Sequence, residues 1–99
     1  LERYARVYPI GRPRAWLRRG RYLWLSGNTA KAHQLWRKSL AAAVQLAMPY
    51  EQGLAHYEIG RHLEASNPER AEWLQRACDM FGRLGAVSDM ERAKAALDL

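Results

Sequence analysis

The fold is decided by a nine-residue stretch that occurs twice, as AWLRRGRYL at residues 15–23 and as AHYEIGRHL at residues 55–63. The two copies lie forty residues apart. Each copy is followed by a second apolar helix, and these second helices end thirty-eight residues apart, in Leu46-Ala47 and Leu84-Gly85. A period in this range is typical of helix-pair repeats that stack side by side. Such arrays usually bind or brace other proteins and rarely catalyse reactions.

Length and composition indicate one small globular domain or a piece of a larger one. The chain has 99 residues, of which 48% are hydrophobic and 26% are charged. It begins with Leu1, and its first and last segments read as incomplete helices, so we expect it to be part of a longer polypeptide. No apolar run approaches the roughly 20 residues that cross a bilayer. The single Cys78 is expected to be a small buried hydrophobe, which fits a cytoplasmic location.

Apolar residues at helical spacing predict four full helices and a helical segment at each end, with no strand. Prolines and glycines mark the breaks between them, and Ser88 with Glu91 has the pattern of a capping box. Asn67 is expected to cap the helix that has Pro68 at its first position. The expected helices cover residues 1–8, 13–26, 29–47, 49–65, 68–84 and 88–97. Short connections then favour antiparallel neighbours, with 13–47 and 49–85 as two repeats and 88–99 as the first helix of a third.

The same pattern predicts how the helices pack. Gly20 is expected to allow the close approach of a partner helix, because a glycine in mid-helix otherwise costs about 1 kcal/mol. Trp24 sits at a position that can face either a ligand groove or the neighbouring repeat. We expect the other tryptophans to act as packing anchors, namely Trp16, Trp36 and Trp73. In the helix that ends near Leu84, the residues expected to point inward are Ala71, Leu74, Ala77, Cys78 and Phe81.

These positions resemble the tetratricopeptide repeat. In the first copy, Trp16, Gly20 and Leu23 fill the first-helix slots of that family, and Ala32, Trp36 and Ser39 fill the second-helix slots. The second copy matches less well. Its first helix has His56, Ile59, Gly60 and Leu63, and its second helix has Ala71, Leu74, Ala77 and Phe81 in a shifted register. Its period also exceeds the family's length of about 34 residues. The resemblance implies an α-solenoid in which the first helix of each repeat lines a concave groove.

A narrower resemblance is carried by residues 37–43 and 46–61 and extends over residues 9–97. These runs are similar to the C-terminal repeats of large bacterial signalling proteins that carry a predicted signal-transduction ATPase module. Many of those proteins also carry an adenylate/guanylate cyclase or a serine/threonine kinase domain. The resemblance implies a regulatory, non-enzymatic protein-interaction module within such a multidomain protein. No nucleotide-binding or cyclase motif is present in the chain itself.

Arginines supply the candidate binding site. Residues 1–21 contain seven arginines and one acid, whereas the other seventy-eight residues carry nine basic and nine acidic groups. The resemblance implies that the ligand-facing slots are Arg14, Leu17, Arg21 and Trp24 in the first repeat, and Leu54, Tyr57, Arg61 and Glu64 in the second. Arginine beside aromatic rings suits an acidic peptide or a neighbouring domain. The predicted partner-binding residues are Arg14, Arg18, Arg21, Trp24, Tyr57 and Arg61.

Other interpretations remain open at this point. The arginines could be solvated or could face preceding repeats, and the chain could instead be a scaffold that self-associates through its exposed ends. A basic nucleic-acid-binding segment that uses Tyr4, Tyr8, Trp16 and Tyr22 is a third interpretation, and we expect it least. Glu58 and His62 share a helix face, but one such pair falls short of a metal site, so no metal, cofactor or enzymatic activity is expected.

Overall fold

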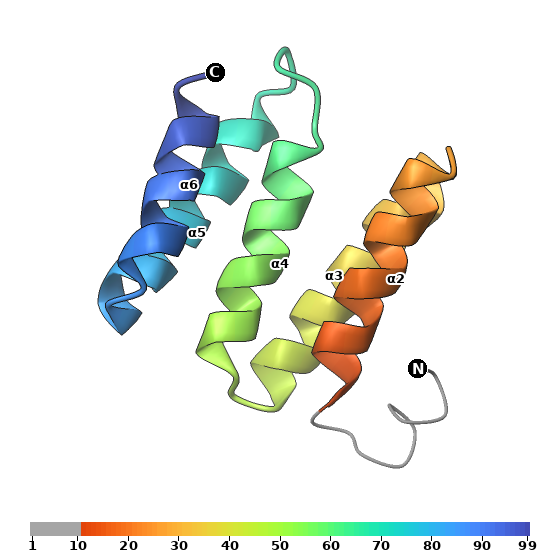
Figure 1. Ribbon diagram of the computed structural model, residues 1–99, viewed down its shortest axis with the longest axis horizontal. Helices are drawn as coiled ribbons and strands as arrows, with labels where there is room; N and C mark the ends of the chain where they lie inside the picture. Colours follow the sequence, from red (N-terminus) through yellow and green to blue (C-terminus); the bar gives the residue numbers. More distant parts are fainter. Residues whose placement is uncertain (1–10) are drawn as a thin grey trace.

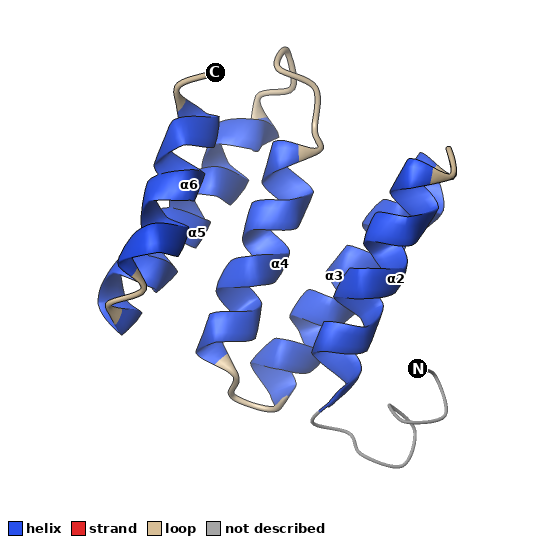
Figure 2. Cartoon of the chain, viewed as in Figure 1, coloured by secondary structure: helices blue, strands red, loops and turns tan. Residues whose placement is uncertain are grey.

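Five helices follow one another through residues 11–99, which are the residues that this computed structural model describes. The expected all-α fold is confirmed for this part of the chain, where no strand occurs (Figure 2). The helical segment expected at residues 1–8 lies outside the described residues. The helices are α2 (Arg12–Leu25), α3 (Thr29–Gln45), α4 (Pro49–Arg61), α5 (Glu69–Leu84) and α6 (Val87–Leu97). No helix within residues 11–99 is both long enough and apolar enough to span a membrane.

Three of the helices end in the same turn, which explains why their sequences end alike. A residue just past the helix has a left-handed backbone in each case, with φ of 92° at Gly27, 52° at Ala47 and 72° at Gly85. Gly27 and Ala47 lie two residues after the end of their helix, and Gly85 lies directly after it. The next amide then donates to the carbonyl five residues back, at 2.8 to 2.9 Å. This six-residue closure satisfies a carbonyl that the helix end would otherwise leave unpaired. The repeated endings in the sequence are therefore two copies of one C-terminal turn.

The helix starts differ from the prediction in two places. The Oδ1 atom of Asn67 accepts a hydrogen bond from the Glu69 amide at 2.9 Å, as expected for a cap, although the helix begins one residue later, at Glu69. The capping box predicted at Ser88 is wrong, because α6 begins at Val87 and no side chain caps it. The preceding turn already starts this helix, since the Met90 amide donates to the Ala86 carbonyl at 2.9 Å.

Helix α4 is shorter than expected. It ends at Arg61 instead of near residue 65. The Nδ1 atom of His62 lies 2.8 Å from the Glu58 carbonyl, and residues 62–68 continue as turns and irregular backbone. The longer connection to α5 accounts for the shifted register of the second repeat in the sequence.

Consecutive helices are antiparallel and form two layers, with α2, α4 and α6 in front and α3 and α5 behind them (Figure 1). Hydrogen bonds between α2 and α3 show this direction directly. Ser39 Oγ donates to the Pro13 carbonyl at 2.7 Å, and Trp36 Nε1 donates to the Leu17 carbonyl at 3.3 Å. The partner number falls along α3 as the number rises along α2, so the two helices run in opposite directions.

Glycines in the front layer receive the largest side chains of the back layer. A Cβ atom at Gly20 would lie 2.4 Å from Trp36 Nε1, and one at Gly53 would lie 2.6 Å from a ring carbon of Phe81. A Cβ atom at Gly60 would lie 2.8 Å from Cγ of Leu74. The predicted role of Gly20 is therefore confirmed, and the same arrangement recurs twice in the second pair.

The core matches most of the predicted apolar positions, although the expected anchors Trp16 and Trp73 are only partly buried. Trp36, Ile59, Leu74 and Phe81 are among the largest fully buried side chains. Ala71, which was expected to point inward, is exposed. Because α5 begins only at Glu69, Ala71 lies in its first turn, before the stretch that packs under Gly60.

Contacts between helices of the same layer reproduce the sequence period in space. Arg14 of α2 meets Glu51 of α4, and Tyr50 of α4 meets Asp89 of α6. These pairs are 37 and 39 residues apart. The second helix pair is thus displaced from the first by about one sequence period, and α2, α4 and α6 run parallel to one another.

Candidate protein-docking site

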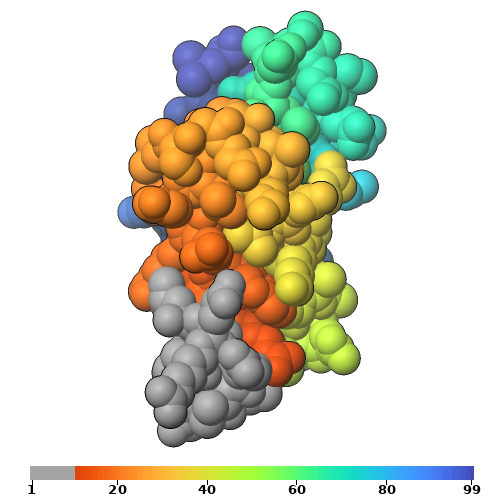
Figure 3. Space-filling view, turned by 90° about the vertical axis from the view of Figure 1, so that its right-hand side faces the viewer, coloured from red at the N-terminus to blue at the C-terminus, as the bar shows by residue number. Residues whose placement is uncertain are grey.

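Charge is divided between the two ends of the molecule. The α2–α3 pair, residues 12–45, contains eight lysines and arginines and no acidic residue. Residues 49–99 contain six basic and nine acidic residues. The two helices of the basic pair lie side by side at the end of the molecule that faces the viewer in Figure 3. The described residues therefore give this end of the molecule a positive electrostatic potential.

Arg14 joins the two helix pairs to each other. Its Nε lies 3.1 Å from Oε2 of Glu51 on α4, and its guanidinium carbon lies 5.6 Å from the ring centroid of Tyr50. Tyr50 in turn donates a hydrogen bond from its hydroxyl to Asp89 Oδ2 at 3.0 Å. The Arg14 side chain is about half exposed, so a ligand that contacted it would share its guanidinium with this internal ion pair.

Arg18 and Arg21 follow Arg14 at helical spacing and are both exposed. Within residues 11–99, no carboxylate lies within the 4.0 Å of an ion pair from either guanidinium. Their charges are therefore not neutralised inside the described part of the chain. These two side chains are the predicted site residues that are best placed to receive an acidic ligand.

Trp24 and Leu17 face the neighbouring helices. The Trp24 ring packs against His33, Trp36 and His62, with centroid distances of 5.8, 6.0 and 4.5 Å. Leu17 is only 7% exposed and belongs to the core, although the family slot would have made it ligand-facing. Of the two orientations that the sequence left open for Trp24, the structure shows the one directed at the second helix pair.

Tyr57 and Arg61 lie together on α4, with a third residue from α6. The guanidinium carbons of Arg61 and Arg92 lie 5.4 and 6.0 Å from the Tyr57 ring centroid. Arg61 also donates from Nε to Oε1 of Glu58 at 3.3 Å, and Arg92 forms an ion pair with Asp89. Sequence reasoning missed Arg92, because no ligand slots were assigned to the incomplete third repeat. The exposed pair Arg18 and Arg21 of α2 and the Tyr57 group of α4 and α6 all come from the front layer. The five side chains Arg18, Arg21, Tyr57, Arg61 and Arg92 are together called the arginine face below.

His33 and His62 meet between the two helix pairs, whereas His56 of α4 packs on Trp73 of α5 within the second pair. Burial lowers the pKa of His33 and His62, and burial together with the nearby charge of Arg76 lowers the pKa of His56 to about 4. His62 Nδ1 also lies 3.6 Å from Oε2 of Glu58, which makes the expected helix-face pair. The described residues contain no group of three side chains that could hold a metal ion.

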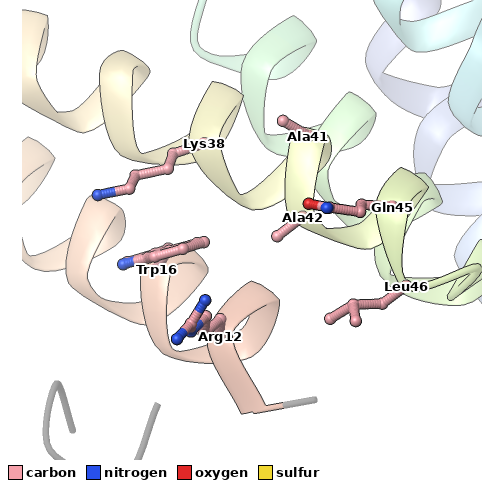
Figure 4. A pocket seen from close by; sticks show the side chains of 7 residues that line it. All are labelled: Arg12, Trp16, Lys38, Ala41, Ala42, Gln45 and Leu46. Atoms are coloured by element: carbon pink, nitrogen blue, oxygen red, sulfur yellow. The ribbon is translucent and has the colours of Figure 1, made fainter. Parts of the chain in front are cut away.

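A pocket of about 360 Å³ opens between α2 and α3 (Figure 4). Trp16 lies between Lys38 and Arg12 in this view, and the Nζ of Lys38 is 4.7 Å from its ring centroid. Trp16 is thus only partly buried, whereas Trp36 is fully buried as an anchor. The other lining residues are Ala41, Ala42 and Gln45 of α3 and Leu46, which directly follows this helix.

Comparisons of the chain with family models, with curated proteins and with solved structures found no match.

Proposed function

We propose that the chain is a tetratricopeptide-like helix-repeat module that docks an acidic protein segment on the arginine face. It acts without enzymatic activity, as a cytoplasmic regulatory part of a bacterial multidomain signalling protein. The ligand is an acidic peptide or an acidic surface of a neighbouring domain. Its carboxylates pair with Arg18 and Arg21, and the Tyr57 ring and its two arginines contact the next part of the segment.

One observation carries this proposal: Arg18 and Arg21 are exposed on a helix pair that contains no acidic residue. Unpaired guanidiniums are suited to bidentate contacts with carboxylates. The displacement of the second helix pair by about one sequence period supports a repeat that lays α2, α4 and α6 side by side. Such a layer offers an extended surface, which is how stacked repeats usually bind their partners.

The test is a binding measurement with a fluorescein-labelled peptide of ten glutamates, by anisotropy at fixed salt. We expect Arg18→Glu/Arg21→Glu to weaken binding by more than about tenfold, because each lost contact is a charge-assisted hydrogen bond. The control is Arg83→Glu/Lys94→Glu, which changes the net charge equally at exposed positions of α5 and α6. Equal weakening by both double variants would show attraction by net charge alone and would contradict the proposal.

A second candidate function is self-association, which is favoured by exposed apolar side chains on the last turns of α2. Tyr22 is 66% exposed and Leu25 is 84% exposed. A second copy that covered them would remove apolar area from water. Sedimentation velocity of the same samples separates the two candidates. A concentration-dependent dimer that Leu25→Glu abolishes, together with unchanged peptide binding, would assign Leu25 to the second function.

A further inference from the structure

A second cationic site lies in the back layer, away from the arginine face. Trp73 of α5 is half-buried, and the guanidinium carbons of Arg37 and Arg76 lie 5.2 and 5.6 Å from its ring centroid. Arg37 comes from α3, so the site joins the two helix pairs. The His56 ring of α4 packs against the same tryptophan at 5.4 Å. These four residues are called the Trp73 cluster.

The two guanidiniums of this cluster are held in place and unpaired. Both arginines are exposed, and within residues 11–99 no carboxylate lies within 4.0 Å of either one. Contact with the indole restricts the guanidiniums without using their hydrogen-bond donors. A ligand therefore meets donors that have already lost part of their freedom, which lowers the entropic cost of binding.

The charge around the cluster is positive on α3 and balanced on α5, which carries Glu69, Glu72 and Asp79 beside its three arginines. The α3 helix that supplies Arg37 contains three basic residues and no acidic residue. The charge of Arg76 contributes to the lowered pKa of His56, after burial. On α5, the nearby Asp79 accepts a hydrogen bond from Gln75 Nε2 at 3.0 Å and does not pair with Arg76.

We infer that the Trp73 cluster is a second docking site, which binds two carboxylates of an acidic helical segment from a partner protein. The guanidinium carbons are no more than about 11 Å apart, because both lie within 5.6 Å of one centroid. Glutamates one turn apart on a helix lie within reach of such a pair. A single-stranded nucleic acid fits less well, since base stacking needs an open ring face and the guanidiniums already lie over this ring.

The experiment is an NMR titration of the whole chain with an alanine-based helical peptide that carries glutamates one turn apart. The Trp73 indole N–H signal, assigned with Trp73→Phe, is expected to shift and saturate. Arg37→Gln/Arg76→Gln should weaken this binding about tenfold, whereas Arg83→Gln/Lys94→Gln, with the same loss of charge, should leave it nearly unchanged. Because the arginine face stays intact in both variants, this result is independent of the proposal for that face.

Three outcomes would overturn the inference. The Trp73 signal could stay fixed while the peptide binds elsewhere, or no binding could occur at millimolar peptide. Alternatively, a ten-residue deoxythymidine strand could shift the Trp73 signal at lower concentrations than the peptide does, which would assign the cluster to nucleic acid.

Discussion

Gly20 is the residue at which the two layers approach most closely. The space that its missing side chain leaves is filled by the Trp36 indole, which also donates a hydrogen bond to the Leu17 carbonyl one turn earlier. A methyl group at Gly20 would overlap the Trp36 ring, which is fully buried. The glycine is therefore a packing requirement, in spite of its poor helix propensity.

We predict that Gly20→Ala destabilises the protein by about 1–3 kcal/mol, because overpacking outweighs the gain in helix propensity. Chemical denaturation with circular dichroism measures this change. Gly82→Ala is the matched control, because its added Cβ would meet only the flexible Met90 side chain, at 3.3 Å from Sδ. If the two variants were equally stable, the close contact of Gly20 with Trp36 would not matter for folding.

Histidine and tryptophan rings pack against one another where helices α3, α4 and α5 meet. His62 stacks on Trp36 with centroids 4.5 Å apart, His33 packs on Trp36 at 5.0 Å, and His56 packs on Trp73 at 5.4 Å. All three imidazoles have a lowered pKa for which burial is the largest cause. When one of these imidazoles binds a proton in the folded protein, its positive charge is partly buried and lies near an arginine.

Stability should therefore fall in mild acid. An unfolded histidine titrates near its ordinary pKa of 6.5, whereas folded His56 binds its proton only near pH 4. Between these values the unfolded state holds more protons, so the free energy of unfolding drops as the pH falls from 6.5 toward about 4 and levels off below that. We predict that His56→Gln makes this dependence shallower in urea melts. Parallel curves for the two proteins between pH 4 and 7 would contradict the assignment.

Some features of the helices could be predicted from the sequence, and others could not. Helical spacing identified the five helices of residues 11–99 and the close approach of a partner helix at Gly20, because periodicity shows which residues share a face. It does not show which neighbouring helix that face meets, so the orientation of Trp24 stayed open until the structure placed it against His62. The start of α6 was mispredicted because the turn at Gly85 already supplies the first carbonyl, which leaves Ser88 inside the helix.

For the whole molecule, the decisive property is the separation of charge between the helix pairs. The sequence showed the basic excess near its start, and the helix bounds assign this excess to the complete α2–α3 pair, which lacks acids. The contact of Arg92 with Tyr57 could not be predicted, because it depends on how α6 packs beside α4. The arginine face is thus assembled from three helices, of which the sequence identified two.

The most direct test of acidic docking on this face is amide chemical-shift mapping of the chain with the ten-glutamate peptide. We expect saturable shifts that concentrate between Arg18 and Leu25 of α2 and around Tyr57 and Arg61 of α4. These shifts should be lost in Arg18→Glu/Arg21→Glu, while the spectrum of that variant otherwise stays folded. Saturable shifts confined to α5 and α6, or a wild-type spectrum that does not change, would contradict the central claim.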